Sequence, residues 1–148
     1  MKKFLLILTG FILFNNVTGQ VSNRINIFNK DSGITGFSID DYDRFNPTEN
    51  DFLIADSLAK IYIIQNSGKL THDNSSIDNY NDYYKQVYGL INKNGDKIIF
   101  LNCFCSAENN DFWKNKTVSV KGGGKCYFSI KINLTEFKTF DFWINASE

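Results

Sequence analysis

Three cysteines are the residues of this chain best suited to do chemistry. Cys103 and Cys105 are separated by a single residue in the run FLNCFCSAENN, and Cys126 follows a triple glycine. A structural zinc site usually takes four ligands, with two to four residues between paired cysteines, and a C-x-C pair does not fit that spacing. The pattern therefore disfavours a metal site, and we expect no metal or cofactor.

A catalytic thiol would need a base within hydrogen-bond reach, and the chain's single histidine, His72, would have to supply it. His72 falls in a polar stretch, and no helix start follows any of the cysteines. A solvated loop histidine is the favoured interpretation. We predict no catalytic residues, and expect a non-enzymatic protein rather than an enzyme.

Two acidic clusters and the triple glycine are weaker candidates. The clusters are DDYD, residues 40–43, and HDNSSIDNYND, residues 72–82. Neither has the D-x-[DN]-x-[DN]-G spacing of a calcium loop, and aspartates are common in turns for their local hydrogen bonds. Glycines 122–124 lack the Lys-Ser/Thr of a P-loop and lead into a strand, so a bend or bulge is the favoured interpretation.

The N-terminus has the features of an export signal. Two lysines precede the apolar run Phe4–Phe14, and the small-residue exit NNVTGQ follows, with Val17 and Gly19 at the recognition positions. The apolar run is about half of the roughly 20 residues that a membrane span needs. We predict a signal peptide over residues 1–19, a secreted or periplasmic mature chain, and no stable membrane insertion.

Residues 20–148 have a common size for one domain, and we expect a single α+β domain there. Over the whole chain, 16 basic residues balance 16 acidic ones, and no basic stripe is present. A protein that follows a phosphate backbone needs such a stripe, so we expect no nucleic-acid partner.

The first element expected to position these residues is a helix that starts at NPTEND. Asn46 is the expected cap, Pro47 fits the first helical position, and Glu49 completes a capping box. Apolar residues then recur at helical spacing through FLIADSLAKIYIIQ, and Gly68 is the expected stop. So wide an apolar stripe predicts a helix that lies across a sheet.

Four segments rich in β-branched and aromatic residues predict that sheet. They are Tyr83–Asn92, Lys97–Cys105, Thr117–Leu134, which the glycines bend or divide, and Thr139–Asn145. The Asn-Gly pair between the first two is a strong hairpin signal. The expected fold class is α+β, with one main helix packed on a four-stranded antiparallel meander. An irregular N-terminal arm is expected over about residues 20–45, in which RINIFN and GITGFSI are each a candidate short strand.

Strand alternation places the cysteines on one face of this sheet. Cys103 and Cys105 share a face with Ile99 and Leu101, and Cys126 lies in an aliphatic row of the third segment. In an oxidising compartment we predict a disulfide from Cys126 to either Cys103 or Cys105, with the other cysteine left as a free thiol. The alternative is three buried thiols.

The opposite face carries a candidate binding surface. Its members are Phe100, Asn102, Phe104, Tyr127 and Trp143. A mixture of rings and amides suits a sugar, peptide or protein partner, because rings bury area and amides fix orientation. Core packing beneath a second covering layer is the favoured interpretation of these residues, and the binding surface is the alternative.

Three segments carry a family resemblance: YGLINKNGDKIIFLNCF, GGGKCYFSIKINL and FDFWIN. With them, residues 83–145 resemble a group of small exported bacterial proteins without established function. That resemblance implies no catalytic residues. The order of a helix followed by a meander is also similar to cystatin-like and NTF2-like folds, an analogy that does not extend to function.

Two classes of function follow. The preferred one is an exported, non-catalytic binding or interaction module with an unknown protein, peptide or glycan partner. The alternative is an NTF2-like pocket protein that binds a ligand, or acts as an enzyme, between helix and sheet. A filled helix–sheet interface with an exposed aromatic patch favours the first, and a deep cavity holding a group of perturbed pKa favours the second.

Overall fold

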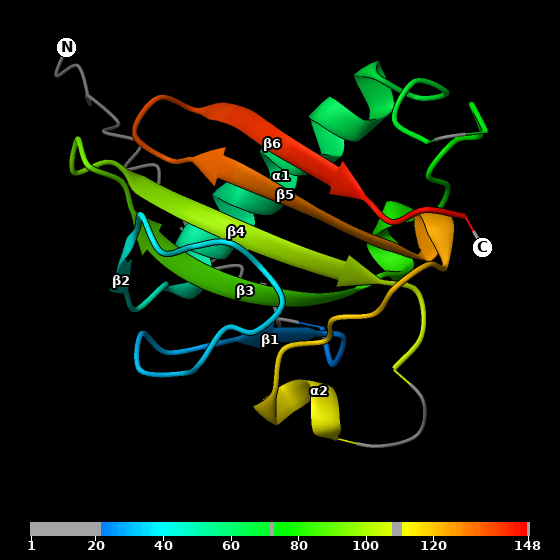
Figure 1. The fold of residues 1–148 in the computed structure, drawn as a ribbon. Coiled ribbons are helices and arrows are strands. Elements are labelled where there is room, and N and C mark those ends of the chain that lie inside the picture. The colour runs from blue at the N-terminus through cyan, green and yellow to red at the C-terminus, as the bar shows by residue number, and fades with distance from the viewer. Residues whose placement is uncertain (1–21, 72, 108–110, 148) are drawn as a thin grey trace, which may run out of the picture.

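The computed structural model describes residues 22–71, 73–107 and 111–147. These residues have an α+β fold, in which one long helix lies against a mixed sheet (Figure 1). The strands are β1 (Ile25–Ile27), β2 (Asp43–Phe45), β3 (Tyr84–Ile91), β4 (Lys97–Phe104), β5 (Tyr127–Asn133) and β6 (Lys138–Ile144). The helices are α1 (Glu49–Gln65) and α2 (Phe112–Asn115), with 3-10 turns η1 (Tyr80–Asp82) and η2 (Gly124–Cys126). The predicted signal peptide and His72 fall outside the described residues.

Strands β3 to β6 pair in chain order as an antiparallel meander, but the sheet does not stop there. On the other edge of β3, β1 pairs in parallel and β2 pairs antiparallel. The prediction of a four-stranded antiparallel sheet is therefore wrong, because the described chain has a mixed sheet of six strands. The N-terminal arm supplies both extra strands and covers an edge of β3 that would otherwise leave its backbone groups unpaired.

Helix α1 begins two residues later than the sequence pattern predicts. Its N-cap is Thr48, whose side chain accepts a hydrogen bond of 3.1 Å from the backbone N–H of Asp51. The Asp51 carboxylate accepts one of 2.8 Å from the Thr48 N–H, which completes a capping box. The predicted cap, Asn46, instead accepts a hydrogen bond from the backbone of Lys30 and so tethers the arm. The helix ends at Gln65, before Gly68.

The main core fills the space between α1 and the sheet. Its helix residues are Phe52, Ala55, Ala59 and Ile63, and its sheet residues include Val87, Ile99, Leu101, Cys103, Phe128, Ile130 and Ile132. The two alanines are completely buried, and such small side chains let the helix approach the sheet closely. Among the described residues, no helix has the length and apolar character needed to cross a membrane.

The strand register decides which cysteine forms the disulfide. Cys103 of β4 lies opposite Phe128 of β5, and two residues further along the backbone of Cys105 bonds that of Cys126. Cys105 and Cys126 form a disulfide with a Cα–Cα distance of 5.0 Å. Cys103 remains a free, buried thiol in the main core. Burial is the main reason why the pKa of this thiol is raised far above its ordinary value.

Candidate functional site

The face of the sheet opposite α1 is organised in rows that run across four strands. One row joins Gln86, Asn102, Ser129 and Trp143, which are successive register partners on β3, β4, β5 and β6. The neighbouring row joins Tyr88, Phe100, Lys131 and Phe140. Each row thus changes from buried residues on β3 to more accessible residues on β6.

Two segments cover the β3–β4 half of this face. The N-terminal arm crosses it in front of β3 and β4 (Figure 1). Phe28 of the arm stacks on Tyr88 at 4.6 Å between ring centroids, and Phe37 packs edge-on against Phe100 at 4.9 Å. Trp113 of α2 packs edge-on against Phe104. At the other edge of this face, Trp143 of β6 is 67% exposed.

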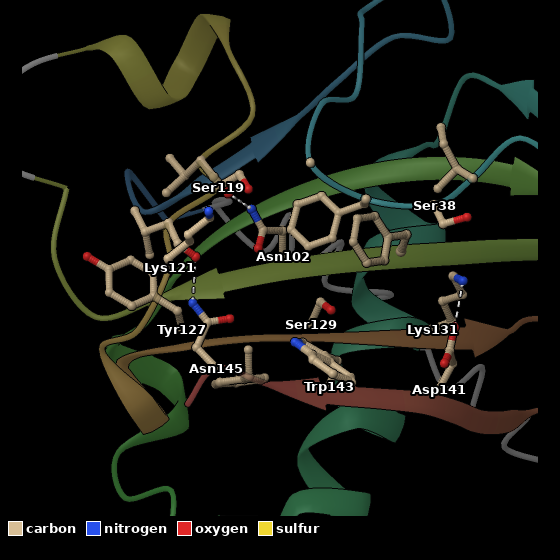
Figure 2. A pocket seen from close by; sticks show the side chains of 17 residues that line it. Ser38, Asn102, Ser119, Lys121, Tyr127, Ser129, Lys131, Asp141, Trp143 and Asn145 are labelled. Atoms are coloured by element: carbon tan, nitrogen blue, oxygen red, sulfur yellow. Dashed lines mark hydrogen bonds and ion pairs between the residues drawn. The ribbon is translucent and has the colours of Figure 1, made fainter. Parts of the chain in front are cut away.

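A groove with a volume of about 580 Å³ lies over strands β4 to β6 on this face (Figure 2). Residues 36–39 of the arm and residues 118–121 of the loop after α2 form its walls. Its floor is the sheet, with Phe100, Asn102, Tyr127, Ser129, Lys131, Asp141, Trp143 and Asn145 among the lining residues. This volume lies in the range of small-ligand sites, about 300–1,000 Å³.

Gln86 fixes the base of the loop wall. This completely buried side chain donates to the carbonyl oxygens of Trp113, at 2.6 Å, and Lys116, at 2.7 Å. Its oxygen accepts from the Asn102 amide and from the backbone N–H of Val118, both at 2.9 Å. All the hydrogen-bonding groups of the glutamine side chain are therefore engaged. They attach the loop wall to β3 by three hydrogen bonds.

Two asparagines fix the rest of the wall and turn their oxygens to the groove. Asn102 uses both amide hydrogens, on Gln86 and on the carbonyl of Val118 at 2.7 Å. Asn145 donates to the carbonyls of Val120 and Gly122, at 2.8 and 2.9 Å. Neither Oδ1 accepts a hydrogen bond from a described residue, and Figure 2 shows both amides beside the groove.

Two glycines allow close approaches that shape the groove. A Cβ on Gly36 would lie 2.2 Å from Oγ of Ser119, so glycine lets the two walls meet. A Cβ on Gly123 would lie 2.6 Å from the ring of Tyr127, and Gly123 also has a left-handed φ of 83°. The triple glycine thus ends the loop and seats Tyr127.

A β-bulge in β6 places a charged pair at one end of the groove. Asp141 and Phe142 lie opposite the single residue Ile130, and Asp141 has a left-handed φ of 53°. This conformation brings the Asp141 carboxylate within 2.6 Å of Nζ of Lys131. The lysine is 8% exposed and its Nζ also lies 4.9 Å from the ring centroid of Tyr42.

The five predicted surface residues have different environments. Phe100 and Phe104 are buried beneath the arm and α2, and Asn102 is 5% exposed. Phe100, Asn102, Tyr127 and Trp143 line the groove, whereas Phe104 does not. Trp143 is 67% exposed and lies across the groove floor (Figure 2).

Sequence reasoning missed Ser129, Lys131 and Asp141. The first two share a strand face with Tyr127 in YFSIKIN, so strand periodicity alone could have added them to the predicted surface. Asp141 owes its position to the bulge, and the walls owe theirs to long-range contacts of the amides. No local sequence signal reports either feature.

A second polar cluster lies inside the helix–sheet interface. Asp56 of α1 bonds Nζ of Lys85 at 2.8 Å and accepts a hydrogen bond of 2.7 Å from the Tyr80 hydroxyl. Nζ also lies 3.9 Å from the Tyr80 ring centroid. Burial, followed by the nearby Cys103 and Asp56, raises the pKa of Tyr80 well above its ordinary value. Each of these groups therefore has a partner inside the interface.

Comparison with family models, with curated proteins and with solved structures returns no match. The resemblance to small exported bacterial proteins therefore stays a prediction. Among the described residues, no group of three or more His, Cys, Asp or Glu side chains could hold a metal ion.

Proposed function

We propose that this chain is an exported, non-catalytic binding module whose ligand site is the groove over β5 and β6. The observation that carries the proposal is Trp143, a large ring that is 67% exposed in a groove lined by hydrogen-bonding groups. A ring this exposed buries much apolar area when a ligand covers it, and convergent polar groups then fix the ligand's orientation.

The packed interface between α1 and the sheet supports this choice of site. The NTF2-like alternative places a ligand between helix and sheet, where the described side chains of α1 and the sheet are packed together. The groove lies on the opposite face, and its walls are the arm and the loop after α2, which lie outside the helix–sheet core. A binding module is therefore favoured over a pocket enzyme.

The disulfide supports the exported part of the proposal. Disulfides persist in oxidising compartments and are rare in the cytosol of mesophiles. Mature protein from the native host should begin near Gln20, and mass spectrometry of its N-terminal peptide checks this. Recovery of a chain that retains Met1 would contradict export by signal-peptide cleavage.

Fragment soaking of crystals tests the site. We expect bound fragments to gather in the groove and to contact the Trp143 ring, because ligand sites attract many small fragments. Fragments that gather between α1 and the sheet, or that avoid the groove, would contradict the proposal. A bound compound recovered chemically unchanged supports binding, whereas its conversion would support the enzymatic alternative.

A further inference from the structure

The two asparagines of the groove offer hydrogen-bond acceptors and no free donors, which restricts the ligand. Asn102 and Asn145 both have their amide hydrogens engaged, on Gln86 Oε1 and on wall carbonyls. What each presents to the groove is therefore a fixed carbonyl oxygen, which can only accept. A complementary ligand must supply hydrogen-bond donors at these two positions.

Ser129 adds a group that can both donate and accept. It lies in the same cross-strand row as Asn102 and Trp143, and its hydroxyl bonds no other described residue. Figure 2 shows Asn102, Ser129 and Asn145 around the part of the groove where the Trp143 ring lies. Two carbonyl oxygens that accept hydrogen bonds and one hydroxyl thus surround the flat apolar surface of the Trp143 ring.

The charges of the groove favour a neutral ligand. Lys131 and Asp141 neutralise each other at 2.6 Å, so neither is left for an ionic ligand. An anion beside Asn102 and Asn145 would face two oxygens that repel it. A cation would find no unpaired carboxylate among the described groove residues. Lys121, at the wall, is the remaining charged lining residue in that part of the chain, and it is exposed, so water solvates its charge without a ligand.

We infer that the groove binds a neutral saccharide, with one sugar ring lying on the Trp143 indole and its hydroxyls donating to Oδ1 of Asn102 and Asn145. A sugar ring has an apolar C–H surface for the indole and several hydroxyl donors at its rim, which matches both features of the groove. The inference rests on the proposed function and names its ligand class. A peptide also carries N–H donors and is the competing outcome.

Calorimetric titration with chitotetraose, cellotetraose and maltotetraose tests this inference, with a tetra-alanine peptide blocked at both ends as the fourth probe. We expect at least one saccharide to bind and the peptide not to bind. Trp143→Ala should weaken saccharide binding about tenfold, because the stacking surface is lost. Ser129→Ala, which removes the hydroxyl with little change of volume, should also weaken saccharide binding.

Phe137→Ala is the matched control for the tryptophan variant. Phe137 is 66% exposed, as is Trp143 at 67%, but it lies outside the groove. Its replacement should leave saccharide affinity unchanged. Equal denaturation midpoints for the two alanine variants would show that both fold.

Three results would overturn the saccharide inference. They are failure of all three saccharides to bind at about 10 mM, binding of the peptide alone, and saccharide binding that Trp143→Ala leaves intact. If saccharides fail while soaked fragments still occupy the groove, the ligand class is wrong but the proposed binding function stands. If fragments avoid the groove as well, both are wrong.

Discussion

Cys105 forms a disulfide and Cys103 stays a free thiol because the two cysteines lie two residues apart along the chain and face different residues of the neighbouring segment. Cys105 lies beyond the end of β4, where its backbone meets that of Cys126, whereas Cys103 lies opposite Phe128. The sequence places all three cysteines on one face but leaves the register across β4 and β5 open. The pairing therefore follows from where the β5 strand begins after the triple glycine.

Thiol counting tests this pairing. The native protein should show no reactive thiol, because Cys103 is buried and its pKa is raised. The denatured, unreduced protein should show one. Reduction should lower the free energy of unfolding by about 3 kcal/mol, the order expected for closing a loop across a sequence separation of 21 residues. Three thiols without reduction would contradict the disulfide.

The raised pKa of the buried Tyr88 hydroxyl predicts a loss of stability at alkaline pH. Burial raises its pKa from 10.0 to about 12, an effect that exceeds the lowering by its hydrogen bond to Thr117 and by Arg44. The folded protein therefore holds this proton more tightly than the unfolded chain does. The corresponding stability is fully present below about pH 10 and is lost as the pH rises to about 12.

Chemical denaturation at a series of pH values measures this effect. The free energy of unfolding should decline over that interval, and Tyr88→Phe should decline less steeply because the titrating group is gone. Tyr83, whose pKa burial also raises to about 12, should maintain part of the slope in the variant. Equal slopes for the two proteins would show that Tyr88 does not contribute.

At the scale of elements, the start of α1 shows why local motifs can misplace a boundary. NPTE and TEND both present a capping residue followed three positions later by an acidic one. The structure uses the second, because Asn46 is engaged by the arm through Lys30. The helix itself was predictable from its apolar periodicity, but its first residue depends on this long-range contact.

Thr48→Ala should destabilise the protein by about 1 kcal/mol, because the Asp51 N–H loses its acceptor. Glu49→Ala is the control, since Glu49 takes no part in the observed capping box, and it should cost less than about 0.5 kcal/mol. Denaturant midpoints compare the two. A larger loss for Glu49→Ala would restore the boundary predicted from the sequence.

The buried Gln86 side chain fixes the base of the loop after α2. Gln86→Leu would leave two wall carbonyls and the Val118 N–H without their partner, and we expect a loss of about 3 kcal/mol or more. Gln65→Leu, at the exposed end of α1, should change stability by less than about 0.5 kcal/mol. Urea denaturation of the two variants makes the comparison. Equal midpoints would mean that Gln86 does not hold the wall.

At the scale of the whole molecule, the sequence predicts the helix, the β3–β6 meander and the alternation of their faces. It does not predict that β1 and β2 join β3, because three-residue strands carry almost no periodic signal. Nor does the sequence predict which residues on the face opposite α1 are covered and which are exposed. Phe100, Phe104 and Trp143 look equivalent in the sequence, and only the paths of the arm and α2 bury the first two and leave the third exposed.

The chain's two tryptophans test whether the groove is the ligand site. Trp143 lies in the groove, whereas Trp113 of α2 is 4% exposed and packs against Phe104. Each indole N–H gives its own signal in a ¹H–¹⁵N NMR spectrum, which can be followed as chitotetraose, cellotetraose or maltotetraose is added. We expect the Trp143 signal to shift with saturation while the Trp113 signal stays in place. A stationary Trp143 signal with all three saccharides, or a shift confined to Trp113, would contradict it.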